Sequence, residues 1–309
     1  MSYGDIPKLE PGPGQIRIKV AVTSVNFADI KARAGAYGQR DLPFVPGLDA
    51  AGVVDAVGEG VNEVAPGVRV AAYTLGGSYA EYALTNEQLC FALPDTVPFE
   101  QGAGIGILIT AYNALTLAGR FREGESVLVH AGAGGVGSTL VQLAKALGAS
   151  HVYATVSSGA KAEVASGLGA DTVINYREQN FAEVINGVTD GAGVDLILDS
   201  VSGENAERGL TCLAEFGRLV IYGHTGAGEA SIGSKPLHKY NRGVIGYSSG
   251  GFRRARPDVI KRSGQEALKL LTAGKVKILL GQRFSLVDAA KAQSLVESRK
   301  SVGKVLLEP

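Results

Sequence analysis

The feature that most constrains this sequence is the glycine-rich segment VLVHAGAGGVG, residues 127–137. It begins with an apolar run typical of a strand, and the residues behind its glycines repeat apolar side chains with the spacing of a helix. Gly132, Gly134 and Gly137 match the pattern G-x-G-x-x-G, which binds dinucleotide phosphates when it joins a strand to a helix. A tight turn without a ligand is the alternative, and the flanking strand and helix favour the phosphate site.

Each glycine of the pattern has a physical task in such a site. Gly132 permits the tight turn, Gly134 lets the backbone approach a pyrophosphate, and Gly137 lets the helix pack closely on the strand. The N-terminus of the helix then offers free N–H groups and a positive partial charge to the phosphates. The segment therefore predicts a dinucleotide-binding loop.

Strands and helical patterns alternate behind Thr110. The expected strands are residues 126–131, 151–156, 171–175, 194–201 and 218–223, with 242–248 as a candidate sixth strand. This alternation predicts a parallel sheet covered by helices on both faces. The sequence before Thr110 is rich in short strands with period-two alternation, and the C-terminal part combines two helical runs with a β-prone tail. We therefore expect an α/β protein in which a doubly wound domain, 110–247, is inserted between 1–109 and 248–309, the two parts of a second domain.

Composition and charge narrow the function classes. The 309 residues carry 30 Lys and Arg against 30 Asp and Glu, so a basic surface for nucleic acid or an anionic membrane is not indicated. The basic stretch FRRARPDVIKRS, 252–263, is interpreted as a solvated helix face, with RNA binding as the alternative. No apolar run is long enough to span a membrane, and Cys90 and Cys212 have no near partners, so we expect a cytoplasmic protein in a reducing compartment.

The second expected strand decides which dinucleotide is bound. In NAD-binding domains, an Asp or Glu about 20 residues behind the glycine loop binds the ribose 2′-hydroxyl. Here the corresponding sequence is VSSGAK, which contains Ser157 and Lys161 but no acid. Because hydroxyls and an ammonium group attract a 2′-phosphate, the sequence predicts NADPH. Tyr176, behind the third strand, is a candidate to close over the same phosphate; a solvated lysine and a packed surface tyrosine are the alternatives.

Several motifs along the chain resemble one known family. They are VLVHAGAGGVGSTLVQLAKALGA, VNFADIKARAGAY, PFVPGLDAAGVVDAVGEGV, GSYAEYAL, ITAYNAL, LGADTVINYRE and DLILDSV. Together they resemble the zinc-free medium-chain dehydrogenases/reductases, in the NADPH:quinone oxidoreductase branch that includes zeta-crystallin. The resemblance implies a discontinuous GroES-like catalytic domain, a Rossmann domain inserted within it, NADPH as the cofactor and a homodimer.

The resemblance also implies roles for individual residues. It places Asn26, Asp29 and Thr110 near the nicotinamide and Tyr37 in the substrate pocket. The cofactor-binding positions that it implies, beside the three glycines of the loop, are Gly135, Val136, Ser157, Lys161, Tyr176, Ser200, Gly223, Gly303 and Lys304. One departure concerns the substrate, because a tyrosine found near it in some relatives is Lys31 here.

The sequence argues against a zinc centre. Zinc alcohol dehydrogenases of this superfamily bind catalytic zinc through Cys and His, and the matching positions here hold Asn26 and the segment Gly47-Leu48-Asp49. Two cysteines cannot form a four-cysteine structural site, and the four histidines lack ligand spacing; His130 is interpreted as a packed or hydrogen-bonding residue. Without a Lewis acid for alcohol oxidation, hydride transfer to a conjugated acceptor fits better, with the proton coming from solvent or from Tyr37.

The predicted function is therefore an NADPH-dependent reductase of a quinone or another conjugated carbonyl. A stand-alone enoyl reductase acting on acyl thioesters is the alternative within the same enzyme class. An NADPH-binding structural or RNA-binding protein is the alternative from a different class.

Overall fold

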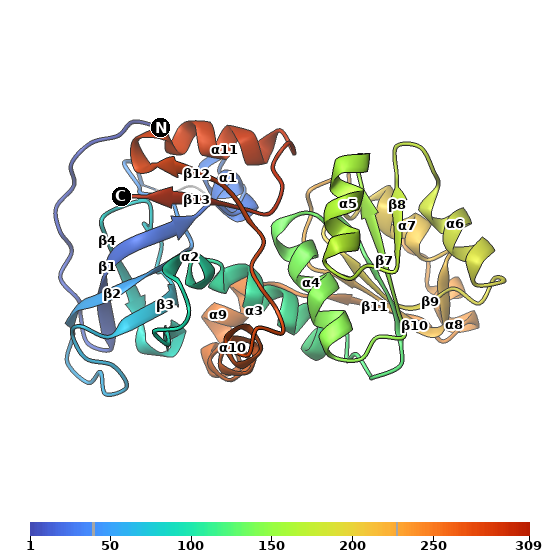
Figure 1. The fold of residues 1–309 in the computed structure, drawn as a ribbon, viewed down its shortest axis with the longest axis horizontal. Helices are drawn as coiled ribbons and strands as arrows, with labels where there is room; N and C mark the ends of the chain where they lie inside the picture. The colour runs from blue at the N-terminus through green and yellow to red at the C-terminus, as the bar shows by residue number, and fades with distance from the viewer. Residues whose placement is uncertain (39–40, 227) are drawn as a thin grey trace. The chain divides into compact units, whose positions relative to one another are not determined.

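The computed structural model describes residues 1–38, 41–226 and 228–309. The chain forms two compact units (Figure 1). Unit 1 comprises residues 1–109, 252–274 and 278–309, and unit 2 comprises residues 110–251 and 275–277. Both ends of the chain thus belong to unit 1, and the middle of the chain forms unit 2.

Unit 1 is built on a seven-stranded sheet. Its strands are β1 (Gln15–Ser24), β2 (Asp49–Val57), β3 (Arg69–Tyr73), β4 (Tyr82–Asn86), β5 (Cys90–Ala92), β12 (Leu280–Ser285) and β13 (Lys304–Glu308). They follow the order β12-β13-β1-β2-β3-β5, with β4 also paired to β1. Among the described residues of this sheet, only β12 and β13 pair in parallel, and the other pairs are antiparallel. The C-terminal strand β13 therefore lies beside the first strand, β1.

The period-two pattern of β1 explains the core of this unit. Ile16 and Ile18 are fully buried, where they pack with Val54 and Val70, while Lys19, the next residue along the strand, is exposed. The helical elements of unit 1 and its borders are α1 (Phe27–Arg33), η1 (Glu87–Leu89), α2 (Phe99–Gly102), α3 (Ile105–Asn113), α9 (Ser249–Ala255), α10 (Pro257–Thr272), η3 (Leu286–Asp288) and α11 (Ala289–Glu297).

Unit 2 contains a six-stranded parallel sheet. Its strands are β6 (Ser126–Val129), β7 (His151–Val156), β8 (Thr172–Asn175), β9 (Val194–Asp199), β10 (Leu213–Ile221) and β11 (Gly243–Gly246). Their order is β11-β10-β9-β6-β7-β8, so the sheet grows in both directions from β6. This is the strand order of a Rossmann domain, and its topological switch point lies between β6 and β9. The predicted α/β fold is confirmed.

The helices of unit 2 connect these strands. They are η2 (Ala114–Ala118), α4 (Gly135–Ala146), α5 (Gly159–Gly167), α6 (Phe181–Val188), α7 (Glu204–Gly209) and α8 (Ser234–Lys239). The helix α4 begins directly behind the glycine loop, as the sequence predicts, and buries Leu140, Leu143 and Ala144. The loop is therefore held between a buried strand and a buried helix.

The structure corrects the start of one expected strand. The strand expected to begin at residue 218 begins at Leu213, as β10. Leu213 is buried and pairs with Val194, but the register then shifts at Phe216, which has φ 61° and is exposed. This interruption hides the alternation that would identify the start of the strand.

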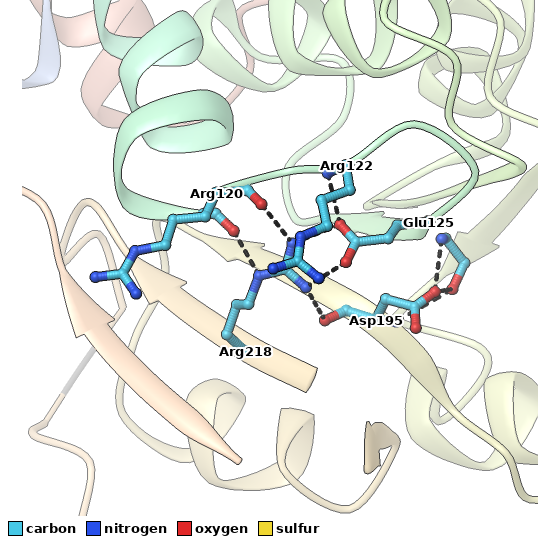
Figure 2. Close-up of polar contacts among 7 residues, drawn as sticks. Arg120, Arg122, Glu125, Asp195 and Arg218 are labelled. Carbon is cyan, nitrogen blue, oxygen red and sulfur yellow. Dashed lines mark hydrogen bonds and ion pairs between the residues drawn. The ribbon is translucent and has the colours of Figure 1, made fainter. Parts of the chain in front are cut away.

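A charged cluster, here called the Arg218 cluster, consists of Arg218, Glu125 and the residues that bond to them through their backbone (Figure 2). Glu125 directly precedes β6, and Asp195 is the second residue of β9. The guanidinium of Arg218 donates to both carboxylate oxygens of Glu125 at 2.8 and 2.5 Å, and to the carbonyl oxygens of Gly119, Arg120 and Asp195. Glu125 also accepts from the backbone N–H of Arg122. The cluster lies at the end of the sheet opposite to the glycine loop, and it joins the segment before β6 to β9 and β10.

Candidate active site

The glycine loop leaves the carboxyl end of β6 in a close-packed conformation. Its turn begins at Ala131, which has φ 57°, and the Gly132 N–H donates to the Thr155 carbonyl at 2.9 Å. A Cβ on Gly137 would lie 2.1 Å from the Ala131 carbonyl oxygen, and a Cβ on Gly132 would lie 2.8 Å from the Ala154 Cβ. Only glycine fits at these two positions. The loop thus has the close packing of strand and helix expected of a dinucleotide-binding turn, and pyrophosphate binding at the N-terminus of α4 stays a prediction.

Buried polar groups lie beneath this loop. His130, at the end of β6, makes a 3.0 Å hydrogen bond between its Nδ1 and Thr155 Oγ1, which confirms it as a packed, hydrogen-bonding residue. Asp199, at the end of β9, accepts from the N–H groups of Val201 and Ser202 at 2.6 and 3.1 Å. Burial lowers the pKa of His130, while the charge of Asp199 acts in the opposite direction. The imidazole of His130 therefore links the end of β6 to Thr155 of β7.

The residues predicted for the 2′-phosphate follow β7 and β8. Ser157 is half-buried, and Ser158 caps α5 by accepting from the Lys161 N–H at 3.4 Å. The pKa of Lys161 is lowered by burial and then by the charge of Arg177, so the two cations lie near one another. Tyr176 is exposed. The sequence reasoning missed Arg177, although the quoted motif NYRE contains it; the pair of cations fits a phosphate dianion better than Lys161 alone.

Ser200 and Gly223 are brought together where β9 and β10 end. A Cβ on Gly223 would lie 3.1 Å from the Ser200 carbonyl oxygen, so the two backbones are in close contact. The same carbonyl accepts from the Thr225 N–H at 2.9 Å. Thr110 lies half-buried in α3. The carboxyl edge of the sheet therefore carries the glycine loop, Ser200 and Gly223 at neighbouring strands.

Unit 1 contains a buried polar network, here called the Lys304 cluster: Asn26, Asp29, Asp49, Tyr79 and Lys304. Lys304 Nζ donates to Asn26 Oδ1 at 2.5 Å and to the Val25 carbonyl at 2.9 Å. Asn26 Nδ2 donates to Asp49 Oδ1 at 2.9 Å, and the Ser24 hydroxyl donates to the same oxygen at 2.5 Å. Asp29 Oδ2 accepts from the Asn26 backbone N–H at 2.8 Å and from the Tyr79 hydroxyl at 3.2 Å.

Two carboxylates and one ammonium group share this buried space. Burial raises the pKa of Asp29 to about 7, with a further contribution from the charge of Asp49, while its hydrogen bonds and Lys304 oppose the shift. Burial lowers the pKa of Lys304, and the charges of Asp49 and Asp29 oppose that shift. Burial also raises the pKa of Tyr79. Because Asp29 titrates near neutrality, this carboxyl can hold or release a proton under physiological conditions.

The sequence reasoning found only part of this cluster. It named Asn26, Asp29 and Lys304 but gave no positive role to Asp49, which it considered only as a position without a zinc ligand. It did not single out Tyr79. The strand pairs β1–β2 and β1–β13 bring these residues together, and that long-range pairing leaves no local signal.

The other predicted residues of unit 1 lie around this network. Tyr37 follows α1 and is 61% exposed; its pKa is raised by partial burial and then by the charge of Asp29, against the effect of Arg253. Gly303 has φ 65°, and a Cβ there would lie 2.4 Å from the Leu279 carbonyl oxygen. Gly303 thus permits the turn that directs Lys304 inward, and its contact with a cofactor stays a prediction.

Comparison with known proteins adds independent evidence. One family model, the alcohol dehydrogenase GroES-like domain, matches residues 12–95, and another, the zinc-binding dehydrogenase, matches residues 135–265. The chain is 33% identical to a quinone oxidoreductase of Pseudomonas aeruginosa over 320 residues, which cover 100% of this chain and 95% of that protein. The chain belongs to the quinone oxidoreductase family of medium-chain dehydrogenases/reductases. The resemblance expected from the motifs is confirmed.

Two further comparisons show how this quinone oxidoreductase family member matches one solved structure and part of one larger protein. The crystal structure of Escherichia coli quinone oxidoreductase complexed with NADPH matches with a TM-score of 0.92 at 31% identity, covering 99% of this chain and 95% of that chain. A phenolphthiocerol/phthiocerol polyketide synthase protein of Mycobacterium tuberculosis is 33% identical, and the match covers 99% of this chain but 14% of that protein. The fold is thus shared by separate enzymes and by a segment of a larger synthase.

The described side chains of this family member form no metal centre. Across residues 1–38, 41–226 and 228–309, no three His, Cys, Asp or Glu side chains are grouped as they would be to hold a metal ion. Within the same ranges, no helix has the length and apolar character needed to cross a membrane.

The basic stretch at 252–263 is engaged within unit 1. Lys261 donates to the carbonyl oxygens of Glu87 and Cys90 and forms an ion pair with Glu63. Arg256 and Arg262 both pair with Asp258. These partners favour a structural role for the stretch over an RNA-binding one.

Proposed function

We propose that this chain is an NADPH-dependent reductase that transfers hydride to a quinone or another conjugated carbonyl without a metal ion. The observation that carries the proposal is the glycine loop at the switch point of the unit 2 sheet, followed by Ser157 and Lys161 behind β7, where an NAD-binding domain would carry an acid. Arg177, behind β8, adds a second cation near Lys161. The relatives named quinone oxidoreductase, one of them complexed with NADPH, support the same cofactor and reaction.

In this proposal unit 2 is the cofactor-binding domain. The N–H groups at the start of α4, including those of Gly135 and Val136, bind the pyrophosphate. Ser157, Lys161 and Tyr176, with Arg177, bind the 2′-phosphate. Ser200, Gly223 and Thr110 lie along the nicotinamide half of the cofactor. When bound, NADPH supplies the hydride, and the residues of the chain hold it and exclude water.

Unit 1 is the catalytic domain in this proposal. Asn26 donates a hydrogen bond to a reacting carbonyl, and Tyr37 contacts the substrate. The reduction also consumes one proton. Asp29, whose pKa burial raises to about 7, can store that proton, whereas the raised pKa of Tyr37 makes its phenol a weaker acid.

The test is a direct assay of the purified protein. Oxidation of NADPH is followed with 1,4-benzoquinone, with 9,10-phenanthrenequinone and with a few enones, against the rate without protein. Crotonyl-CoA is assayed in parallel to test the enoyl reductase alternative. Quinone-dependent oxidation above the background is expected; a rate no faster than the background with every quinone and enone contradicts the proposal.

We also propose a cytoplasmic homodimer. Strand β11 is an edge of the unit 2 sheet in the described part of the chain, so it has backbone groups that a second copy can pair. Cys90 and Cys212 are both buried free thiols, as expected in a reducing compartment. Light scattering after size-exclusion chromatography is expected to give twice the mass of the chain, and a monomer mass at micromolar concentration contradicts the dimer.

A further inference from the structure

The carboxamide of Asn26 is held at both of its ends by buried charged groups. Its oxygen accepts from the ammonium of Lys304 at 2.5 Å, and its nitrogen donates to the carboxylate of Asp49 at 2.9 Å. Rotating the carboxamide by half a turn would place its NH₂ group against an ammonium and its oxygen against a carboxylate. Both contacts would be repulsive in this buried environment, so the two charges select one orientation.

Burying Lys304 and Asp49 beside Asn26 costs free energy of folding. The ammonium and the carboxylate each lose several kcal/mol of hydration, and replacing a buried charged pair by well-packed apolar residues often leaves a protein just as stable. The backbone also has special requirements, because Gly303 needs φ 65° immediately before Lys304. Asp49, on the nitrogen side of the carboxamide, is packed just as closely. A Cβ on Gly106 would lie 2.3 Å from Asp49 Oδ2, which has no hydrogen-bond partner among the described residues. Buried charge kept at such cost points to a role other than stability.

One donor of the carboxamide makes no hydrogen bond among the described residues. A carboxamide nitrogen carries two N–H groups, and in the described residues Asn26 Nδ2 makes a single hydrogen bond, to Asp49. The ammonium on Oδ1 withdraws electron density from the amide and strengthens its remaining N–H as a donor. Such a donor is suited to a carbonyl oxygen on which negative charge develops as hydride arrives.

We propose that Lys304 is a positioning residue that, together with Asp49, fixes and polarises the Asn26 carboxamide as a hydrogen-bond donor to the carbonyl oxygen of the acceptor. The inference rests on the proposed function for the identity of that carbonyl. It assigns to Lys304 a role through Asn26, in place of the direct cofactor contact that the sequence suggested. The orienting contacts themselves lie entirely within unit 1.

The first experiment is a double-mutant cycle in steady-state kinetics with a quinone acceptor. K304M is expected to lower kcat about 10- to 100-fold, as loss of a supporting partner of an active-site group does, with KM for NADPH changed less than about twofold. N26A is expected to lower kcat similarly, and K304M is expected to add little to N26A because both act through one donor. Lys19→Met, which removes an exposed lysine from β1 of the same unit, is the matched control and is expected to leave kcat unchanged.

The second variant protects the test against misfolding. K304M alone leaves the carboxylate of Asp49 buried without the cation near it. K304M/D49N removes both charges together, so the net charge of the buried cluster does not change. This variant is expected to fold, as judged by thermal unfolding, and still to show the fall in kcat. A folded K304M/D49N with the kcat of the parent chain overturns the inference, and so does a full additional loss from K304M in the N26A background.

A spectroscopic measurement separates this inference from the proposed function. The side-chain amide signal of Asn26 in a ¹⁵N-labelled sample is assigned by its loss in N26A. It is expected to shift in K304M and to stay in place in Lys19→Met. If the signal does not respond to K304M in folded protein, the inference fails even if quinones are reduced. If the parent chain reduces no quinone or enone, the proposed function fails while the amide signal still reports on the contact.

Discussion

The Arg218 cluster of unit 2 and the Lys304 cluster of unit 1 hold charges away from water in different ways. Arg218 forms a bidentate ion pair with Glu125, and its remaining N–H groups donate to backbone carbonyl oxygens (Figure 2). Lys304 instead shares a buried space with two carboxylates, Asp29 and Asp49. One cation thus balances one anion in the first cluster, and one cation faces two potential anions in the second.

The difference shows where the fold gives stability and where it retains reactivity. A bidentate ion pair satisfies both of its charges, and here it joins three segments of the sheet. Burial, and then the charge of Asp49, raise the pKa of Asp29 to about 7, so this carboxyl stays partly protonated near neutral pH. Unsatisfied or titrating buried groups mark functional sites more often than saturated ones.

The largest expected effect comes from breaking the Arg218 cluster. Arg218→Met leaves the mostly buried carboxylate of Glu125 without its cation, so unfolding of unit 2 is expected to become about 3–5 kcal/mol easier. Urea denaturation measures this change. Arg122→Met is the matched control, because Arg122 joins the cluster through its backbone N–H, and it is expected to cost less than about 0.5 kcal/mol. Equal losses in the two variants would show that the guanidinium is not the stabilising group.

The second prediction uses pH to test the Lys304 cluster. Because the folded pKa of Asp29 is about 7 and its unfolded pKa is about 4, the folded chain keeps a proton that the unfolded chain has released. Stability from this group is therefore lost as pH rises, by roughly 2–3 kcal/mol between about pH 5 and pH 8. Asp29→Asn keeps an acceptor for the Asn26 N–H and is expected to remove this fall in the free energy of unfolding between about pH 5 and pH 8. Urea midpoints across that pH range measure the fall in the parent chain and in Asp29→Asn, with Lys304, Asp49 and Tyr79 left unchanged. The same pH dependence in the parent chain and the variant would contradict the raised pKa.

A smaller effect is expected in the proposed 2′-phosphate site of unit 2. Lys161→Ala is expected to weaken NADPH binding far more than NADH binding, by about 1.5–3 kcal/mol for a charged hydrogen bond. Fluorescence titration with each cofactor measures the difference. Arg177→Ala, which removes the neighbouring cation, is also expected to weaken NADPH binding more than NADH binding. Equal losses for both cofactors would show that Lys161 does not bind the 2′-phosphate.

The smallest effect is expected for an exposed pair. Lys269 and Glu266 form a 2.7 Å ion pair on the surface of α10, with 71% and 54% of the two side chains exposed. Lys269→Met is expected to change stability by less than about 0.5 kcal/mol, because solvent screens such pairs. A loss as large as that of Arg218→Met, again measured by urea denaturation, would show that burial is not what separates the clusters.

Local patterns were sufficient to predict most of the Rossmann unit. The glycine loop, the helix α4 and the parallel strands each carry their own periodicity, because a buried parallel strand and an amphipathic helix bury side chains at fixed spacings. The start of β10 was missed because the register shift at Phe216 and Gly217 breaks the alternation. Arg177, which the proposed function adds to the 2′-phosphate site, was not predicted because a single cation behind a strand has no pattern of its own.

The chain's sequence by itself determined the loop, the absence of an acid behind β7 and the family to which the chain belongs. Only the tertiary structure decided that Lys304, near the end of the chain, reaches Asn26 near its beginning. That contact depends on the pairing of β13 with β1, and the raised pKa of Asp29 depends on burial and then on the charge of Asp49, against the effect of Lys304. Local sequence sets backbone preferences over a few residues, whereas burial and charge pairing are set by residues that only the completed sheet brings together.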